Sequence, residues 1–313
     1  MRGIPIAQRD DRQRDDRELA RVRRSGTKPC RRGHVEPEVT QTLRFRASVY
    51  EGQLRQPPHA HDHPQISLVL SGRLRESVRG TDVLAGSLSV VVKDTGVMHE
   101  DEFGPGRVAV AQLSLPGGSL RDLMGTGDRT PVWHWSHHVS VASPFMRLVT
   151  RAACGATMFA SDDTDVVDVL AAITSRPQTA TRGAPPRWLC DARDDLRETW
   201  RAGTRVSDVA TRIGVHPVYL ARCFRRWYGH SVSDELRMLR QRAATDAIVA
   251  GQHTLSAVAH AAGYADEAHL NREFRNMCGV APGRFRRLLG NVDFQDWTSG
   301  CNKRLRGFKS GRL

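Results

Sequence analysis

A helical pattern that occurs twice constrains this chain more than any other feature. The first copy reads VSDVATRIG over residues 206–214 and the second reads LSAVAHAAG over residues 255–263, an offset of 49 residues. A second motif follows each copy, LARCF at 220–224 and LNREF at 270–274, at an offset of 50. A register kept through both motifs indicates two copies of one structural unit.

Each copy predicts two short helices joined by a turn. Apolar residues at i, i+3, i+4 and i+7 form the buried stripe of a helix, and the glycine after them, Gly214 or Gly263, permits a left-handed stop. In the helix that follows, a leucine and a phenylalanine four residues apart form the inward face. This arrangement is a helix-turn-helix, whose second helix can enter the major groove of DNA.

The outward positions of the second helices are the candidate DNA contacts. They are Val218, Ala221, Arg222, Arg225 and Arg226 in the first unit and Glu267, Ala268, Asn271, Arg272 and Arg275 in the second. Arg222 and Arg272 occupy matched positions, where an arginine can donate to guanine O6 and N7 or hold a phosphate. Asn271 can read adenine. The candidates for phosphate contacts are Arg225, Arg226, Arg275 and Arg286.

The net charge of +13 is unevenly distributed along the chain. Residues 187–290 carry 17 basic and 11 acidic residues, whereas residues 41–186 carry 14 of each. A basic region beside an electrically balanced one predicts that the repeat meets a polyanion and that the middle of the chain does not.

Residues 188–290 resemble the DNA-binding domain of the AraC/XylS family of bacterial transcription regulators. The first unit matches in Asp208-Val-Ala210, Gly214, Leu220-Ala-Arg222-Cys-Phe224 and Gly229. The second matches in Val258-Ala259, Gly263-Tyr264, His269-Leu-Asn-Arg-Glu-Phe274, Gly279-Val-Ala-Pro282 and Phe285-Arg286. The resemblance implies a seven-helix domain whose two recognition helices enter successive major grooves, about one helical turn apart.

Two positions in the first unit depart from the family pattern. Val232 stands where the family has the proline that Pro282 supplies in the second unit, and His216 stands where a Ser or Thr cap precedes Pro217. Proline is favourable in the first helical turn, so the helix should still begin there, with a weaker cap.

The neutral region before the repeat has a different pattern. Short apolar runs cut by Gly and Pro, such as ISLVL at 66–70 and VAVAQL at 108–113, predict strands of a small antiparallel barrel or sandwich. Two amphipathic helices are expected next, at about 144–158 and 164–175, to cover the barrel or to pair with a second copy of the chain. The motif WHWSHH at 133–138 is expected to be structural or a loop.

Histidines in this region resemble the two cupin motifs. His59, His61, His63 and Gln65 alternate in the sequence, which predicts that they share one face of a strand, and His99 follows later in a GVMH motif. Imidazoles that converge with an oxygen donor suit Fe, Mn or Zn. Gln65, however, stands where cupins have an acidic ligand.

We therefore predict an effector pocket without a cofactor, and the alternative is a divalent metal on the same side chains. The residues for either site are His59, His61, Gln65 and His99. The predicted fold is α+β, with an N-terminal cupin-like β-barrel followed by two helices and an all-α C-terminal domain that contains two helix-turn-helix units.

Composition sets the domain boundaries. The Pro, Gly, Thr and Arg content of SRPQTATRGAPPR at 175–187 is typical of a linker. The predicted segments are a disordered basic extension at 1–40, a sensor and dimerisation domain at 41–175, a linker at 176–187, the double helix-turn-helix at 188–290 and a disordered basic tail at 291–313.

Missing motifs limit the other classes of function. The six cysteines form no Cys-x-x-Cys pair, and no apolar run reaches the length of a membrane span or resembles a secretory signal. These observations favour a cytoplasmic protein without a membrane partner. The chain has no Gly-x-Ser-x-Gly, phosphate loop, dinucleotide fingerprint or His-Glu-x-x-His motif, so we predict no enzyme activity.

The sequence thus predicts a sequence-specific DNA-binding transcription regulator controlled by a small-molecule effector. The resemblance implies a homodimer that acts as an activator, with double-stranded DNA, the effector and RNA polymerase as partners. One alternative is a cupin metalloenzyme, similar to a dioxygenase, fused to a DNA-binding module. A DNA-binding protein that takes no effector is another.

Overall fold

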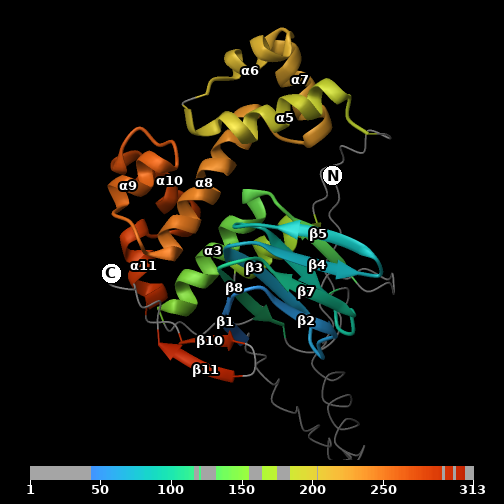
Figure 1. The fold of residues 1–313 in the computed structure, drawn as a ribbon, viewed down its shortest axis with the longest axis vertical. Coiled ribbons are helices and arrows are strands. Elements are labelled where there is room, and N and C mark those ends of the chain that lie inside the picture. The colour runs from blue at the N-terminus through green and yellow to red at the C-terminus, as the bar shows by residue number, and fades with distance from the viewer. Residues whose placement is uncertain are drawn as a thin grey trace, which may run out of the picture. The chain divides into compact units, whose positions relative to one another are not determined.

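A computed structural model provides the fold of the chain (Figure 1). It describes residues 44–115, 120, 132–154, 164–174, 184–202, 204–290, 293–298 and 301–306. The predicted extension at 1–40 and most of the predicted linker at 176–187 lie outside these residues. The regular elements form a mixed α and β fold, with antiparallel sheets first and helices after them.

The larger sheet has seven strands in the order β11-β10-β1-β8-β3-β6-β9, where β10 is Asp293–Thr298 and β11 is Cys301–Arg306. From the first half of the chain it takes β1 (Arg44–Glu51), β3 (Gln65–Ser71), β6 (Val90–Lys93), β8 (Arg107–Ser114) and β9 (Trp133–Ser136). Both faces of β3 are buried, since Ile66, Leu68 and Leu70 belong to one apolar cluster and Val69 to another. Burial on both faces explains the uninterrupted apolar run at 66–70.

The smaller sheet has four strands in the order β2-β7-β4-β5. They are β2 (Leu54–His59), β4 (Leu74–Val78), β5 (Thr81–Ala85) and β7 (His99–Phe103). An apolar cluster lies between the sheets, where the rings of Tyr50 on β1 and Phe103 on β7 stack with their centroids 3.6 Å apart.

Among the described strands no closed barrel forms, which corrects the predicted barrel. The chain leaves the extended path after His59, and β2 then pairs with β7 while β3 pairs with β6 and β8. His59 and Gln65, expected to share one strand, therefore lie in strands of different sheets.

The C-terminal tail also differs from the prediction. Residues expected to lack structure form β10 (Asp293–Thr298) and β11 (Cys301–Arg306), and β10 pairs in parallel with β1. Without β10, β1 would be an edge strand with a row of unpaired backbone groups, and the added strand satisfies them. The composition of the tail shows its charge but not this backbone pairing.

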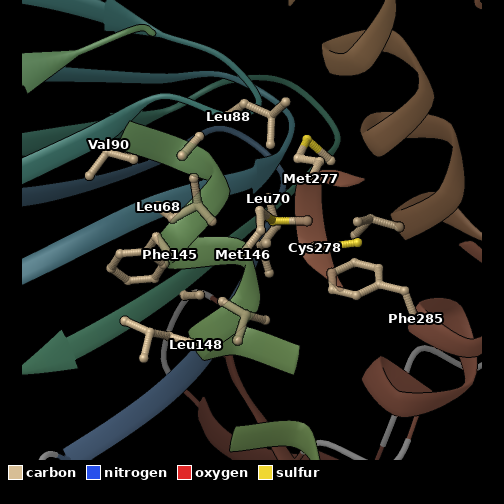
Figure 2. Close-up of a cluster of buried hydrophobic side chains, with 14 of the residues drawn as sticks. Leu68, Leu70, Leu88, Val90, Phe145, Met146, Leu148, Met277, Cys278 and Phe285 are labelled. Atoms are coloured by element: carbon tan, nitrogen blue, oxygen red, sulfur yellow. The ribbon is translucent and has the colours of Figure 1, made fainter. Parts of the chain in front are cut away.

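Two helices follow the sheets, α3 (Val139–Ala153) and α4 (Thr164–Thr174). Helix α3 begins five residues before the predicted start, because the side chain of His138 caps it by accepting a hydrogen bond from the Ser140 N–H at 3.2 Å. Its apolar face packs into the main core within the chain. Figure 2 shows Phe145, Met146 and Leu148 of α3 in the same cluster as side chains from the sheet and from the C-terminal helices.

Between residues 187 and 290, the regular elements of the described residues are all helices. Its helices are α5 (Arg187–Thr199), the short 3-10 turn η2 (Trp200–Ala202), α6 (Val206–Ile213), α7 (Pro217–Tyr228), α8 (Val232–Ala250), α9 (Leu255–Ala261), α10 (Glu267–Cys278) and α11 (Pro282–Gly290). These seven α-helices agree with the seven that the family resemblance implies.

Helix α8 contacts the sheets as well as the helices on either side of it. Its Asp246 accepts hydrogen bonds from the Gly72 N–H at 3.0 Å and from the Ser87 hydroxyl, and Arg242 donates to the carbonyl oxygen of His137. Gly72 directly follows β3 and has a positive φ of 81°. A Cβ there would lie 2.6 Å from the carbonyl oxygen of Arg107, so the position requires glycine.

Candidate nucleic-acid interface

The first helix-turn-helix unit consists of α6 and α7. Val209 and Ala210 of α6 and Leu220 and Phe224 of α7 are buried in one cluster with residues of α5. Gly214 ends α6 with a φ of 77°, the left-handed stop that the sequence predicts. The inward face of this unit is confirmed.

The second unit consists of α9 and α10 and repeats this construction. Val258, Ala259, Leu270 and Phe274 are buried, in a core continuous with that of the sheets. Asp266 caps α10 by accepting a hydrogen bond from the His269 N–H at 2.6 Å. A capped helix start holds the first turn, which is the part of a recognition helix that meets base edges.

The candidate DNA contacts lie on the opposite faces of α7 and α10. The exposed residues are Val218, Ala221, Arg222, Arg225, Arg226, Glu267, Ala268, Arg272 and Arg275, and Asn271 is partly exposed. The sequence therefore places these positions correctly with respect to the cores. Arg286 is different, because it donates to the carbonyl oxygens of Ile248 at 3.3 Å and His253 at 2.8 Å. These bonds hold the end of α8, so the structure does not favour the predicted phosphate contact of Arg286.

The two departures of the first unit prove compatible with its fold. His216 caps α7, since its Nδ1 accepts a hydrogen bond from the Val218 N–H at 3.3 Å. Val232 begins α8 with its side chain buried, and Ser231 and Asp234 form a reciprocal capping box around it. The missing Ser, Thr or Pro is thus replaced by a ring nitrogen and by a different cap.

The start of α8 is fixed by a buried carboxylate that the sequence does not reveal. Glu235 accepts from Arg193 of α5 at 3.0 Å and from His230 Nε2 at 2.6 Å. The other ring nitrogen of His230 lies 2.8 Å from the carbonyl oxygen of Tyr228. Burial would raise the pKa of Glu235, but these two partners outweigh it and lower the pKa to about 2.

Three of the four candidate pocket residues come together, His59 on β2, His99 on the paired strand β7 and His61 in the segment after β2. The ring centroids of His59 and His99 lie 4.3 Å apart, and His61 lies 5.1 Å from each. The expected shared strand face is wrong, because only His59 is in β2 and only Gln65 is in β3. His63 is exposed in the segment between the two strands.

A buried lysine occupies the centre of this site. Lys93 Nζ lies 2.7 Å from Glu76 Oε2 and 3.0 Å from His99 Nε2, and Lys93 pairs with Gln65 across β6 and β3. His99 Nδ1 faces the carbonyl oxygen of Val97 at 2.9 Å and must therefore carry a hydrogen. In the neutral ring, Nε2 is then the acceptor for the ammonium group of Lys93.

Burial and the lysine charge set the protonation of the site. Burial lowers the pKa of His61 to about 3 and that of His99 to about 4, and the neighbouring ammonium group acts in the same direction. Asp101 lies 3.9 Å from His99 Nε2, and burial raises its pKa to about 7. Both Asp101 Oδ1 and Gln65 Oε1 are buried and have no hydrogen-bond partner among the described residues.

These side chains do not fit a metal ion in this arrangement. The nitrogens of His59, His61 and His99 lie within 4.8 Å of one another, as a metal site requires. His99 Nε2, however, accepts from Lys93, and a divalent cation would have to displace a buried ammonium group that is already paired with Glu76. The arrangement suits hydrogen bonding to a polar organic molecule better than coordination.

The WHWSHH motif has a structural role, as one of its two expected interpretations has it, and its first part is a strand and not a loop. Residues 133–136 form β9, and the indole N–H groups of Trp133 and Trp135 donate to Glu76 Oε1 at 2.5 and 3.1 Å. The alternation of two tryptophans is the signal that could have predicted a strand. Glu76 thus accepts hydrogen bonds from three donors. Burial alone would raise the pKa of Glu76, but these partners lower it, so the carboxylate stays ionised.

The arrangement of α6, α7, α9 and α10 agrees with a comparison to known families. Residues 209–288 match a family model described as a helix-turn-helix domain, and that domain is of the AraC type. The match spans α7 to α10 with most of α6 and α11. An AraC-type helix-turn-helix domain therefore occupies this part of the chain.

Several solved structures are similar to the chain at low identity. ToxT from Vibrio cholerae is 10% identical, with 79% of this chain and 98% of that chain covered and a TM-score of 0.33. The C-terminal domain of AraT, a response regulator from Geobacillus stearothermophilus, is 22% identical, with 34% and 88% covered and a TM-score of 0.32.

The DNA-binding domain of AdpA, a global transcriptional factor solved with a target DNA, is 21% identical, with 34% and 92% covered and a TM-score of 0.31. TM-scores this low do not establish a common fold, so the assignment rests on the family match and on the helices themselves. A sequence search among curated proteins found no match. No helix in the described ranges is long and apolar enough to cross a membrane.

Proposed function

We propose that this chain is a sequence-specific DNA-binding transcription regulator. The observation that carries the proposal is the pair of helix-turn-helix units, joined by the single 19-residue helix α8, with exposed arginines at matched positions of both recognition helices. One continuous helix joins the two reading helices, as their placement in two successive major grooves requires.

The contacts to DNA divide by chemistry. We assign base reading to Arg222 and Arg272 and, in the second unit, to Asn271, since guanidinium and amide groups can donate to base edges in pairs. Val218, Ala221 and Ala268 offer apolar contact, and Glu267 can accept from cytosine. Arg225, Arg226 and Arg275 lie one turn further along their helices and are assigned to phosphates.

We further propose that the N-terminal sheets are a cupin-like sensor for a small organic effector. His59 and His61 are half-buried, and the buried His99 lies beside both of them. The unpartnered Gln65 Oε1 and Asp101 Oδ1 support a ligand that donates hydrogen bonds, since buried acceptors are normally satisfied.

A direct path connects this site to the DNA-binding helices. Gln65 begins β3, and Gly72, directly after the end of β3, donates to Asp246 of α8. An effector that favours one position of β3 would bias α8 and with it the spacing of the two units. The mechanism is a population shift, in which the effector stabilises one of two arrangements.

The oligomeric state of the chain and its effect on transcription are also proposals. We propose a homodimer and activation of transcription through RNA polymerase, in the cytoplasm, where the DNA lies. The apolar stripe of α3, predicted to support pairing, is buried inside the chain. Val167 on α4 is 52% exposed and is the better candidate for a contact with a second copy.

DNA selection from a random pool tests the main proposal. The full chain should enrich one sequence, and a gel-shift titration should show at least a hundredfold preference for it over scrambled DNA at the same salt concentration, as specific regulators show ratios of about 10³ or more. Enrichment of no sequence would refute sequence-specific binding.

The three gathered imidazoles favour a second candidate, a metalloenzyme attached to the DNA-binding domain. Metal analysis of the purified protein separates the two. Stoichiometric Fe or Mn that is lost in a His59→Ala/His99→Ala double variant would support the enzyme. Our proposal expects no such metal and a thermal shift with an organic effector instead.

A further inference from the structure

A cavity lies between the two helix-turn-helix units. Its walls come from the start of α6, from the first half of α8 and from α10 with the turn before it. The volume of about 340 Å³ falls in the range of small-ligand sites, which is about 300 to 1,000 Å³. A molecule bound there would touch both units and the helix that joins them.

Guanidinium groups dominate the wall of the cavity. Arg205, Arg237 and Arg240 line the cavity together with one carboxylate, that of Glu273. Arg237 is already paired, at 3.4 Å from Asp234 and 3.7 Å from Glu273. The net charge that remains is positive and belongs to Arg205 and Arg240.

Arg240 lacks an acceptor that its position calls for. Its Nε is buried and has no hydrogen-bond partner in the described part of the chain. A guanidinium group stays protonated in proteins, and a buried N–H without an acceptor is costly. Arg240 also lines the cavity, so the rest of its guanidinium group can donate to an anion bound there.

The remaining lining fits an anion that carries a small organic group. His269 Nδ1 accepts a long hydrogen bond, 3.5 Å, from the Ala265 N–H, so Nε2 of the neutral ring is a donor. The ring of Tyr264 packs edge-on against His269, with centroids 5.2 Å apart, and Leu236 completes an apolar wall. The cavity therefore combines several donors with one apolar side.

We propose that this cavity binds a phosphoryl group through Arg205 and Arg240. A guanidinium fork matches the oxygens of a phosphate and can bind two of them at once. The group has two sources, a soluble phosphate monoester or a phosphodiester of the DNA backbone between the two grooves. The second source rests on the proposed function, and the first does not.

Binding there has a consequence for DNA recognition. The anion bridges α6 of the first unit and α10 of the second across α8, so occupancy stabilises one separation of the two units. A soluble phosphate ester would then act as a second effector, independent of the histidine site.

Thermal unfolding of the full chain tests the soluble source. The wild type is measured with inorganic phosphate, glucose 6-phosphate and glucose at matched ionic strength, beside Arg240→Gln and the exposed-residue variant Arg205→Gln. Arg197→Gln, on the exposed face of α5, is the matched control. We expect Tm to rise with either phosphate compound but not with glucose, and the rise to vanish in both cavity variants but not in the control.

The salt dependence of DNA binding tests the other source. Each lost phosphate contact lowers the slope of log K against log salt by about 1. A lower slope in Arg240→Gln and Arg205→Gln, with an unchanged slope in Arg197→Gln, assigns the site to the DNA backbone. The proposal is overturned if the cavity variants match the wild type both in the Tm response to the phosphate compounds and in the salt slope of DNA binding. Should the chain bind no DNA, the proposed function fails while the thermal test still decides the cavity.

Discussion

At the scale of single residues, the matched pair Arg222 and Arg272 carries most of the proposed specificity. Both are exposed, and the cores behind them are built from the same leucine and phenylalanine positions. An arginine that reads a base contributes differently from one that holds a phosphate, and substitution separates the two roles.

We expect Arg272→Ala to weaken binding to the selected DNA by about 1 to 3 kcal/mol and to relax the preference at one base position, because a bidentate base contact is lost. Gel-shift titration on the selected site and on single-base variants measures both effects. Arg197→Ala serves as the control. A uniform loss across all sequences would reassign Arg272 to a phosphate.

The cap of α7 gives a second prediction at this scale. His216→Ala should lower the free energy of unfolding by about 0.5 to 2 kcal/mol, since the Val218 N–H loses its acceptor. His216→Ser should preserve stability, because a serine hydroxyl is a good cap. Denaturant unfolding measures both variants, and equal stability of the alanine and wild-type proteins would show that the ring nitrogen is not a working cap.

At the scale of elements, α8 is the central part of the chain. It joins the two units, lines the inter-unit cavity and contacts the sheets through Asp246. Its two ends depend on different interactions: a buried ion cluster at the start and hydrogen bonds from Arg286 near the end.

Asp246→Ala should reduce the free energy of unfolding by about 1 to 3 kcal/mol, because the Gly72 N–H and the Ser87 hydroxyl lose their shared acceptor. Asp246→Asn keeps the Oδ1 acceptor and should cost clearly less. Urea titrations of the three proteins at neutral pH provide the comparison. Identical losses in both variants would mean that the charge, and not the hydrogen bonds, matters at this contact.

The start of α8 should make stability depend on acid pH. Glu235 has its pKa lowered from 4.5 to about 2 in the folded chain by His230 and Arg193, against the opposing effect of burial. Because the pKa is lower in the folded chain, the ionised carboxylate adds on the order of 3 kcal/mol to the free energy of unfolding above pH 4.5. This contribution is lost as the pH falls towards 2. The stability difference between wild type and Glu235→Gln should therefore shrink through this window. A difference that is constant from pH 6 to pH 3 would contradict the role of Glu235.

At the scale of the whole molecule, local pattern and long-range pairing differ in how well the sequence reveals them. The helix-turn-helix units were predictable because apolar spacing, glycine stops and caps all act within a few residues. The C-terminal strands were not, since Ala47 pairs with Phe294 from the other end of the chain. Local composition carries no information on such a partner.

The histidine site was predictable only in part for the same reason. The residues of the motif were found, but Lys93 lies at the end of an apolar run, and only its pairing with Gln65 on β3 reveals that it is buried beside His99. That lysine changes the expected chemistry of the site from coordination to hydrogen bonding. A single buried cation outside the motif thus decides between the two interpretations.

The central claim is that both units read one DNA site together. A hydroxyl-radical footprint of the full chain on its selected DNA tests it most directly, because recognition helices in successive grooves protect the backbone about 10 to 10.5 base pairs apart on one face. We predict two such protected patches, with Arg222→Ala weakening one and Arg272→Ala the other. A single patch that neither variant changes would contradict the account.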